Sequence, residues 1–216
     1  MIPLYETNPA LLSCKESIEA LKGAMIDCFS REGKLLLCGN GGSCADCEHI
    51  VGELMKGFLL PRRMNSLAEK LRAVDPACAD PLAASLQGAL PAISLPHQAG
   101  ILSAFANDVS PETVYAQLVL GYAKEEDLLL CLSTSGNSEN AVNAAKVARA
   151  LGIATAALTG EAESNLSALC DITVRAPARE TYRVQELHLP IYHYLCAAVE
   201  EHFFSDGSDG FLSVRI

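Results

Sequence analysis

Short apolar runs alternate with helical stretches along most of the chain, and this alternation predicts the fold. Five runs have the length of buried strands, at residues 34–39, 92–95, 127–133, 153–158 and 172–174. The two most regular of these runs are apolar at nearly every position, as expected for a parallel sheet covered on both faces. Strands that alternate with helices predict an α/β fold, a doubly wound, five-stranded parallel sheet flanked by helices.

The segments between these runs carry helical periodicity. Helices are predicted over residues 8–32, 43–60, 113–123, 139–151 and 180–204. The first precedes the sheet and is an added N-terminal helix, whose apolar stripe packs either on the domain or on a neighbouring subunit. Ser43 is expected to cap the second helix, and Pro111 lies in the first turn of the third.

Residues 62–90 interrupt the alternation. A basic start at Arg62 and Arg63 leads into a short helical pattern over 67–74 and then into a stretch rich in Pro and Asp. We interpret residues 62–90 as an insertion or lid-like excursion, and residues 205–216 as a polar, mobile tail. No linker divides the chain, so residues 1–216 are predicted to form a single domain.

Composition and charge narrow the class of function. The 216 residues carry a net charge of −10, which disfavours binding to nucleic acid or to an anionic membrane. Neither a membrane span nor a signal peptide is visible. The nine cysteines, an odd number, predict free thiols in a reducing cytoplasm. The single Cys-x-x-Cys, Cys44 and Cys47, favours packing at the start of a helix over a metal or redox site.

Two polar loops each follow an apolar strand and precede a helix. Gly39-Asn-Gly-Gly-Ser43 allows backbone amides to approach an anion, although it is neither a dinucleotide-binding fingerprint nor a P-loop. Ser133-Thr-Ser-Gly-Asn-Ser138 places four hydroxyl groups in six residues. Because ligands of open α/β sheets bind at the carboxyl ends of the strands, the loops predict a site for an anionic small molecule. Ordinary turns and helix caps are the alternatives.

A few side chains in the neighbouring helices are suited to chemistry. His49 and Glu53 are four residues apart and share a helix face, which suits metal binding, acid–base catalysis or a simple hydrogen bond. In the last helix, Gln185 and His193 are eight residues apart on broadly one face, and His188 is a rival ligand. The spacing alone leaves functional and packing roles open.

The two loops resemble the signature loops of the sugar isomerase (SIS) domain family. The resemblance rests on Cys38-Gly-Asn-Gly-Gly-Ser43 and Leu132-Ser-Thr-Ser-Gly-Asn-Ser138, covers most of residues 8–204, and points to the bacterial phosphoheptose isomerases. It implies a flavodoxin-like SIS sheet. It also implies an aldose–ketose isomerase that converts sedoheptulose 7-phosphate to D-glycero-D-manno-heptose 7-phosphate through an enediol.

The resemblance implies roles for individual residues. The phosphate would be held by the hydroxyl loop, at Ser133, Thr134, Ser135 and Ser138. The rest of the substrate would contact Asn40, Gly41, Gly42, Ser43, Asn107, Asp108 and Gln185. One zinc ion per subunit would be bound by His49, Glu53, Gln185 and His193. Glu53 and His193 would form the acid–base pair, in either order. A helix cap before Pro111 is the alternative role for Asn107 and Asp108.

The resemblance also implies a homo-oligomer, which we expect to be a homotetramer with sites between subunits. Two departures from the family pattern leave the identity of the sugar undecided. Residues 62–90 are longer than expected, and Tyr182 stands where some members have a small or acidic residue. One alternative is an isomerase of another sugar phosphate. Another is a non-catalytic SIS protein that senses sugar phosphates or associates with the replication initiator. Such relatives tend to lose the catalytic acidic residue or histidine, whereas this chain retains Glu53 and His193, which favours an enzyme.

Overall fold

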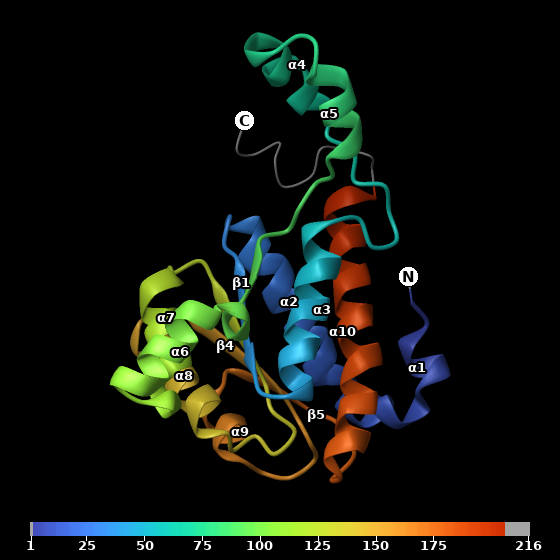
Figure 1. The fold of residues 1–216 in the computed structure, drawn as a ribbon. Helices are drawn as coiled ribbons and strands as arrows, with labels where there is room; N and C mark the ends of the chain where they lie inside the picture. Colours follow the sequence, from blue (N-terminus) through green and yellow to red (C-terminus); the bar gives the residue numbers. More distant parts are fainter. Residues whose placement is uncertain (1, 206–216) are drawn as a thin grey trace.

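Five parallel strands form a single sheet in the computed structural model, which describes residues 2–205 (Figure 1). The strand order is β2-β1-β3-β4-β5. The strands are β1 (Leu35–Gly39), β2 (Ala92–Ser94), β3 (Leu128–Leu132), β4 (Ala154–Thr159) and β5 (Ile172–Arg175). The doubly wound α/β sheet predicted from the sequence is confirmed. The predicted tail lies outside the described residues except for Ser205.

Helices cover both faces of this sheet. The α-helices are α1 (Leu4–Thr7), α2 (Lys15–Ser30), α3 (Gly42–Met55), α4 (Asn65–Val74), α5 (Ala79–Ser85), α6 (Ala99–Asp108), α7 (Val114–Tyr122), α8 (Glu139–Ala150), α9 (Asn165–Leu169) and α10 (Thr181–Phe204). Three short 3-10 helices connect them, η1 (Pro9–Cys14), η2 (Leu95–His97) and η3 (Pro111–Thr113). No helix within residues 2–205 is long and apolar enough to cross a membrane.

The apolar strands divide their side chains between two cores. Leu35 and Leu37 of β1 face a first core with α2, α3 and α10, whereas Leu36 and Cys38 face a second core with α7 and α8. Side chains alternate between the faces of a strand, and here both faces are buried, so the strand reads as one continuous apolar run. This double burial explains why the strands were recognisable from the sequence.

The predicted N-terminal helix is present but divided. Residues 8–32 form η1 and α2, preceded by the short helix α1. Pro9 occupies the start of η1, where its missing N–H costs little. The chain leaves α2 through Glu32, whose φ of 61° is in the left-handed region, and the N–H of Gly33 donates to the Cys28 carbonyl. Leu4 and Leu11 anchor this segment in the first core.

The glycine loop opens α3 differently from the prediction. Gly41 precedes the helix with a φ of 57°, and Gly42 is its first residue. Ser43 was expected to be the cap, but it lies inside the first turn and is buried. A residue without a Cβ adopts the conformation of Gly41 with little strain, so the N-cap lies two residues earlier than expected and has no side chain.

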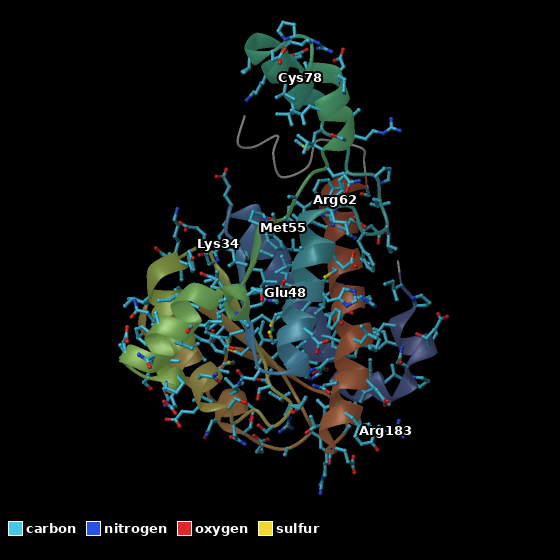
Figure 2. The ribbon with its side chains drawn as sticks, viewed as in Figure 1. Lys34, Glu48, Met55, Arg62, Cys78 and Arg183 are labelled. Carbon is cyan, nitrogen blue, oxygen red and sulfur yellow. The ribbon has the colours of Figure 1, made fainter. Side chains whose placement is uncertain are left out.

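Residues 62–90 form a helical hairpin, α4 and α5, which projects from the rest of the molecule (Figures 1 and 2). Figure 2 shows Arg62 at the foot of the hairpin and Cys78 at its far end. The short helix predicted over 67–74 is present as α4, whereas α5, α6 and α9 were missed. Before the hairpin, α3 ends at Met55 instead of near residue 60, because Lys56 turns to an extended conformation (φ −142°, ψ 173°).

The nine cysteines all lie in the described part of the chain and carry free thiols, as predicted. Within the Cys-x-x-Cys, Cys47 is fully buried in the first core, while Cys44 is partly exposed. Burial raises the pKa of both thiols, so neither is activated as a thiolate. The structure therefore supports a packing role for this pair.

Candidate active site

The two signature loops lie side by side at the carboxyl edge of the sheet, because β1 and β3 are neighbours. The strand order reverses direction between them, and ligands of such sheets bind at this switch point. The amides of Asn40 and Asn140 exchange hydrogen bonds of 2.9 and 3.0 Å across the gap. The Tyr115 hydroxyl, which sequence reasoning missed, donates to the Gly39 carbonyl at 2.9 Å. These bonds join the two loops into one unit.

The hydroxyl loop is ordered by its own hydrogen bonds. The N–H of Gly136 donates to Ser133 Oγ at 3.2 Å, and the hydroxyl groups of Ser133 and Ser138 are 3.1 Å apart. Ser133 is buried while Ser135 is exposed. Ser138 precedes α8 without a side-chain cap, so the positive end of the helix faces the loop. This arrangement can bind a phosphate.

Gly136 sets the shape of this loop. Its φ is 66°, and a Cβ there would lie 2.1 Å from Ser164 Oγ. Gly136→Ala is expected to weaken binding of a sugar phosphate about tenfold, because the loop must shift and the left-handed conformation costs an L-residue about 1–2 kcal/mol. Isothermal titration calorimetry tests this. Gly152→Ala is the matched control, since its φ is 75° but no atom lies within 4 Å. Equal affinities for the two variants would contradict the prediction.

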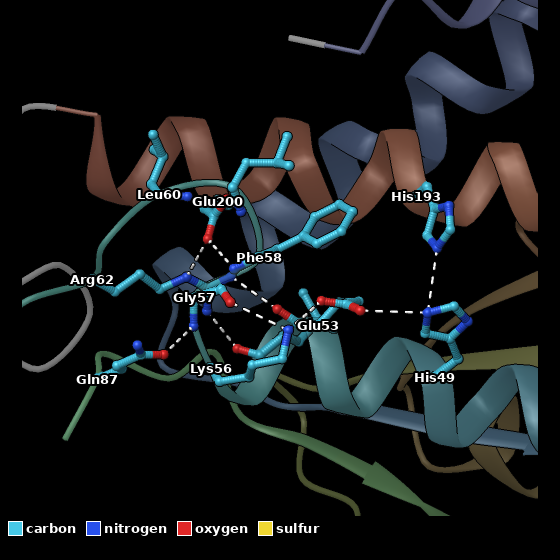
Figure 3. A network of polar contacts seen from close by, with 12 residues as sticks. His49, Glu53, Lys56, Gly57, Phe58, Leu60, Arg62, Gln87, His193 and Glu200 are labelled. Carbon is cyan, nitrogen blue, oxygen red and sulfur yellow. Dashed lines mark hydrogen bonds and ion pairs between the residues drawn. The ribbon is translucent and has the colours of Figure 1, made fainter. Parts of the chain in front are cut away.

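Three of the four predicted zinc ligands meet where α3 packs beside α10 (Figure 3). His49 Nε2 lies 3.4 Å from Glu53 Oε1 and 3.4 Å from His193 Nε2. The other oxygen of Glu53 accepts from Lys56 Nζ at 2.6 Å. Sequence reasoning missed Lys56, although its position three residues after Glu53 on the helix was a usable signal.

The second nitrogen of His49 has partners of its own. His49 Nδ1 lies 2.9 Å from the Tyr192 hydroxyl, which donates to Asp46 Oδ1 at 3.3 Å. Because that hydroxyl proton points to Asp46, the Tyr192 oxygen is left to accept from Nδ1–H. The other ring nitrogen, Nε2, faces Glu53 and His193. Tyr192 therefore orients His49, a role the sequence did not reveal.

The side chains of this cluster are of the types that bind zinc, namely histidine and carboxylate. Among residues 2–205, no three or more His, Cys, Asp or Glu side chains stand arranged so that they could hold a metal ion as they are. The donors around His49 nevertheless have separations of 3.4 Å, the edge of a tetrahedron with bonds of about 2.1 Å, as for Zn–N and Zn–O. Tyr192 supplies the outer hydrogen bond typical of a ligand histidine. The donor types suit zinc and these two separations match those between zinc ligands, while the zinc ion itself stays a prediction.

Gln185 lies against the start of α3. A Cβ on Gly42 would meet Gln185 Nε2 at 2.1 Å, so the amide covers the start of α3. His49 follows Gly42 by seven residues, about 10 Å along the helix at 1.5 Å per residue. In this chain Gln185 therefore adjoins the glycine loop, which suits its predicted contact with substrate. Its role as a zinc ligand stays a prediction.

His188, the rival ligand, is a core residue. It is fully buried, and its Nε2 lies 3.2 Å from the Thr159 carbonyl at the end of β4. Burial lowers the pKa of His188 to about 4, outweighing the hydrogen bond. The ring is thus neutral at pH 7 and donates from Nε2. It ties α10 to the sheet behind the hydroxyl loop.

The low pKa of His188 predicts a loss of stability in acid. The folded-state pKa of about 4 lies below the ordinary 6.5, so the contribution is complete above pH 6.5 and is lost as the pH falls toward 4. The loss amounts to roughly 2 kcal/mol by pH 4.5. His188→Gln, whose amide can still donate to Thr159, should lack this component in urea unfolding between pH 7 and 4.5. Parallel pH profiles for the two proteins would contradict it.

Asn107 and Asp108 lie at the exposed end of α6, where Asn107 donates to Asp108 at 2.8 Å. The cap before Pro111 is instead Ser110, whose hydroxyl accepts from the Glu112 N–H. Because α6 packs against the second core, it lies on the opposite face of the sheet from α3 and α10. Within one chain the structure does not unite these two residues with His49.

The cluster is also open to solvent. The His49 side chain is 42% exposed. A cleft of about 770 Å³ lies elsewhere, between the N-terminal segment and β5, and none of the predicted site residues lines it. Within residues 2–205, His49 is therefore accessible to a ligand from solvent.

Known proteins match this chain over most of its length. The SIS domain family matches residues 101–198. A phosphoheptose isomerase of Clostridium acetobutylicum is 34% identical over 194 residues, covering 90% of this chain and 86% of that protein. One of Helicobacter pylori is 33% identical, covering 90% and 88%. Among solved structures, a phosphoheptose isomerase of Francisella tularensis superposes with a TM-score of 0.73 at 26% identity, covering 93% of this chain and 100% of that one.

Proposed function

This chain belongs to the phosphoheptose isomerases of the SIS domain family, and from that premise we propose that it interconverts sedoheptulose 7-phosphate and D-glycero-D-manno-heptose 7-phosphate. It is an aldose–ketose isomerase. The observation that carries the proposal is the meeting of Glu53 and His193 on either side of His49, on the helix that follows the glycine loop. A non-catalytic SIS protein would need neither group.

The reaction needs a base at carbon and a group that moves protons between oxygens. From the ketose, a base removes a proton from C1, the C2 oxygen gains a proton to give the enediol, and the base returns its proton to C2 as O1 loses one. Glu53 Oε2 pairs with Lys56 Nζ at 2.6 Å, and a carboxylate at this place is the base that would accept the proton from carbon.

His193 suits the second role. Burial, assisted by the neighbouring His49, lowers the pKa of His193, so its ring is neutral at pH 7. A neutral imidazole donates from one nitrogen and accepts at the other, and so it can pass protons between O1 and O2. We therefore assign the carbon base to Glu53 and the oxygen shuttle to His193.

The two loops hold the substrate in register. The phosphate binds the hydroxyl loop at Ser133, Thr134, Ser135 and Ser138, and the sugar lies against the glycine loop and Gln185. Binding energy from the phosphate, which does not react, is used to keep C1 and C2 beside the acid–base pair. The Asn40–Asn140 amide pair fixes the spacing of the loops.

A zinc ion would be held by His49, Glu53 and His193, with Gln185 as the fourth ligand in the family pattern. When bound, it would polarise the substrate carbonyl and stabilise negative charge on oxygen. The remaining steps, phosphate capture and proton movement, belong to the residues of this chain.

We further propose a homotetramer in the cytoplasm. The open site and the placement of Asn107 and Asp108 on the other face support shared sites between subunits, and nine free thiols suit a reducing compartment. Light scattering at micromolar concentration should give about four times the mass of the chain; a stable monomer would refute the assembly.

The deciding experiment is incubation of the purified protein with sedoheptulose 7-phosphate, with added zinc or with a chelator, followed by identification of the products. A heptose 7-phosphate aldose should form, and its yield should depend on zinc if the ion is required. Other ketose phosphates serve as comparison substrates. Binding of the sugar phosphate without any aldose product would favour a sugar-phosphate sensor.

A further inference from the structure

A fully buried ion pair lies at the end of α3, where residues 57–62 pack against α10 (Figure 3). Arg62 Nε donates to Glu200 Oε1 at 2.7 Å, and neither side chain is exposed to solvent. The carboxylate of Glu200 also accepts from three consecutive backbone amides at 2.7, 2.7 and 3.1 Å, those of Phe58, Leu59 and Leu60. Both charges are therefore compensated by short, directed hydrogen bonds.

The other donors of Arg62 bind the end of α3. Its Nη1 donates to the Leu54 carbonyl at 2.6 Å, and its Nη2 donates to the Glu53 carbonyl at 3.0 Å. Nη1 also reaches the carbonyl of Gly88, in the other foot of the hairpin, at 3.4 Å. The last carbonyls of a helix have no partner within it and carry partial negative charge, so a cation there stabilises the final turn.

This contact has a direct consequence for Glu53. The helix ends at Met55, so Glu53 belongs to the last turn, the part of a helix that most readily frays. The direction of its carboxylate depends on that turn remaining helical. Arg62 holds the backbone of Glu53 itself, and Glu200 holds Arg62 from α10, the helix that carries His193. The pair thus connects the two members of the acid–base pair.

Stability alone gives a weaker account of this arrangement. Buried ion pairs often contribute no more than apolar side chains of the same volume, because removal of both charges from water is costly. The planar guanidinium, in contrast, donates in several fixed directions at once, which a lysine cannot do. Here the guanidinium group of Arg62 binds Glu200, the end of α3 and the hairpin. It thereby fixes the positions of these three segments relative to one another.

We propose that Arg62 and Glu200 are positioning residues, which hold the last turn of α3 so that the Glu53 carboxylate stays aimed at the substrate carbon. The proposal rests on the isomerase function proposed above. A displacement of a catalytic group by about 1 Å can lower the rate about 10²-fold. The effect of losing the Arg62–Glu200 pair should therefore be measurable.

The test compares Arg62→Lys and Glu200→Gln with Asp127→Asn. Asp127 is a matched control, since it is also a buried carboxylate that accepts from backbone amides, those of Lys34 and Lys124, but these amides precede β1 and β3 and do not belong to the segment that follows α3. For each folded variant, kcat, KM and the isotope effect with C1-deuterated sedoheptulose 7-phosphate are measured. Hydrogen exchange of residues 50–56 is followed separately and needs no activity.

Loss of the Arg62–Glu200 pair should lower kcat about 10- to 100-fold and leave KM within about twofold of the wild-type value. It should also raise the isotope effect and speed amide hydrogen exchange in the last turn of α3. Asp127→Asn should lower thermal stability without these changes. Suppose that the wild type is active and that Arg62→Lys and Glu200→Gln both leave the isotope effect and the hydrogen exchange unchanged. That result would overturn this inference. A wild type inactive on every sugar phosphate would instead overturn the isomerase proposal, whatever the exchange data show.

Discussion

Glu53→Gln is expected to lower kcat about 10³-fold while leaving the affinity for sedoheptulose 7-phosphate within about twofold. Glutamine keeps the size and shape of the side chain but cannot accept a proton from carbon. The two loops proposed to hold the phosphate and the sugar do not depend on the charge of Glu53. The ion pair with Lys56 is lost, but the Lys56 side chain is 55% exposed, so its contribution to stability is small.

Single-turnover assays and competition binding on the same protein separate these two effects. Glu48→Gln is the matched control, because Glu48 lies on the same helix and pairs with His97 at 3.1 Å, away from the His49 cluster. This control should retain wild-type kcat. If the Glu53 variant turned over at a near-normal rate, Glu53 would be removed from the mechanism.

Arg62→Met is expected to destabilise the protein by about 3–5 kcal/mol, because it leaves the buried carboxylate of Glu200 without its cation. The variant also removes donors from the last carbonyls of α3. A loss of this size is a large part of the stability of a typical domain. The loss of stability should appear as a lower urea concentration at the midpoint of unfolding. The dependence of the free energy of unfolding on urea concentration should be similar to that of the wild type.

Two comparisons make this result specific. Arg149→Met removes the cation of an exposed pair with Asp171, so it should cost less than about 1 kcal/mol. The double variant Arg62→Met/Glu200→Gln should recover about 1–3 kcal/mol relative to additivity, since the buried charge is gone. Full recovery is not expected, because the amides of residues 58–60 lose part of their acceptor. An Arg62 variant no less stable than the Arg149 variant would show that the pair is not a stability determinant.

Strong local signals made much of the fold predictable. The strands β1 and β3 are apolar at every position because both faces are buried, and the helices α8 and α10 carry long periodic patterns. Short elements gave weaker signals. The helix α6 buries none of its residues completely, and α9 has only five residues, so neither shows an apolar stripe long enough to recognise.

The parts of the candidate site that lie within one short segment could be recognised from the sequence. The glycine loop, the hydroxyl loop and the pair His49 and Glu53 each lie within a short segment, where strand–loop–helix order and helical spacing fix the geometry. The end of α3 was misjudged, because Glu200, about 140 residues away, binds the amides that would have continued the helix. The local pattern of hydrophobic and polar residues does not reveal a contact between residues so far apart in the chain.

By itself, then, the sequence determined the sheet, the two polar loops and the side chains able to do acid–base chemistry, since these follow from periodicity and residue type. Only the tertiary structure decided which of them meet. It brought His193 to His49, placed Gln185 beside Gly42, and buried His188 in the core. It also joined Arg62 to Glu200, because burial and charge pairing arise from packing between segments distant in the chain.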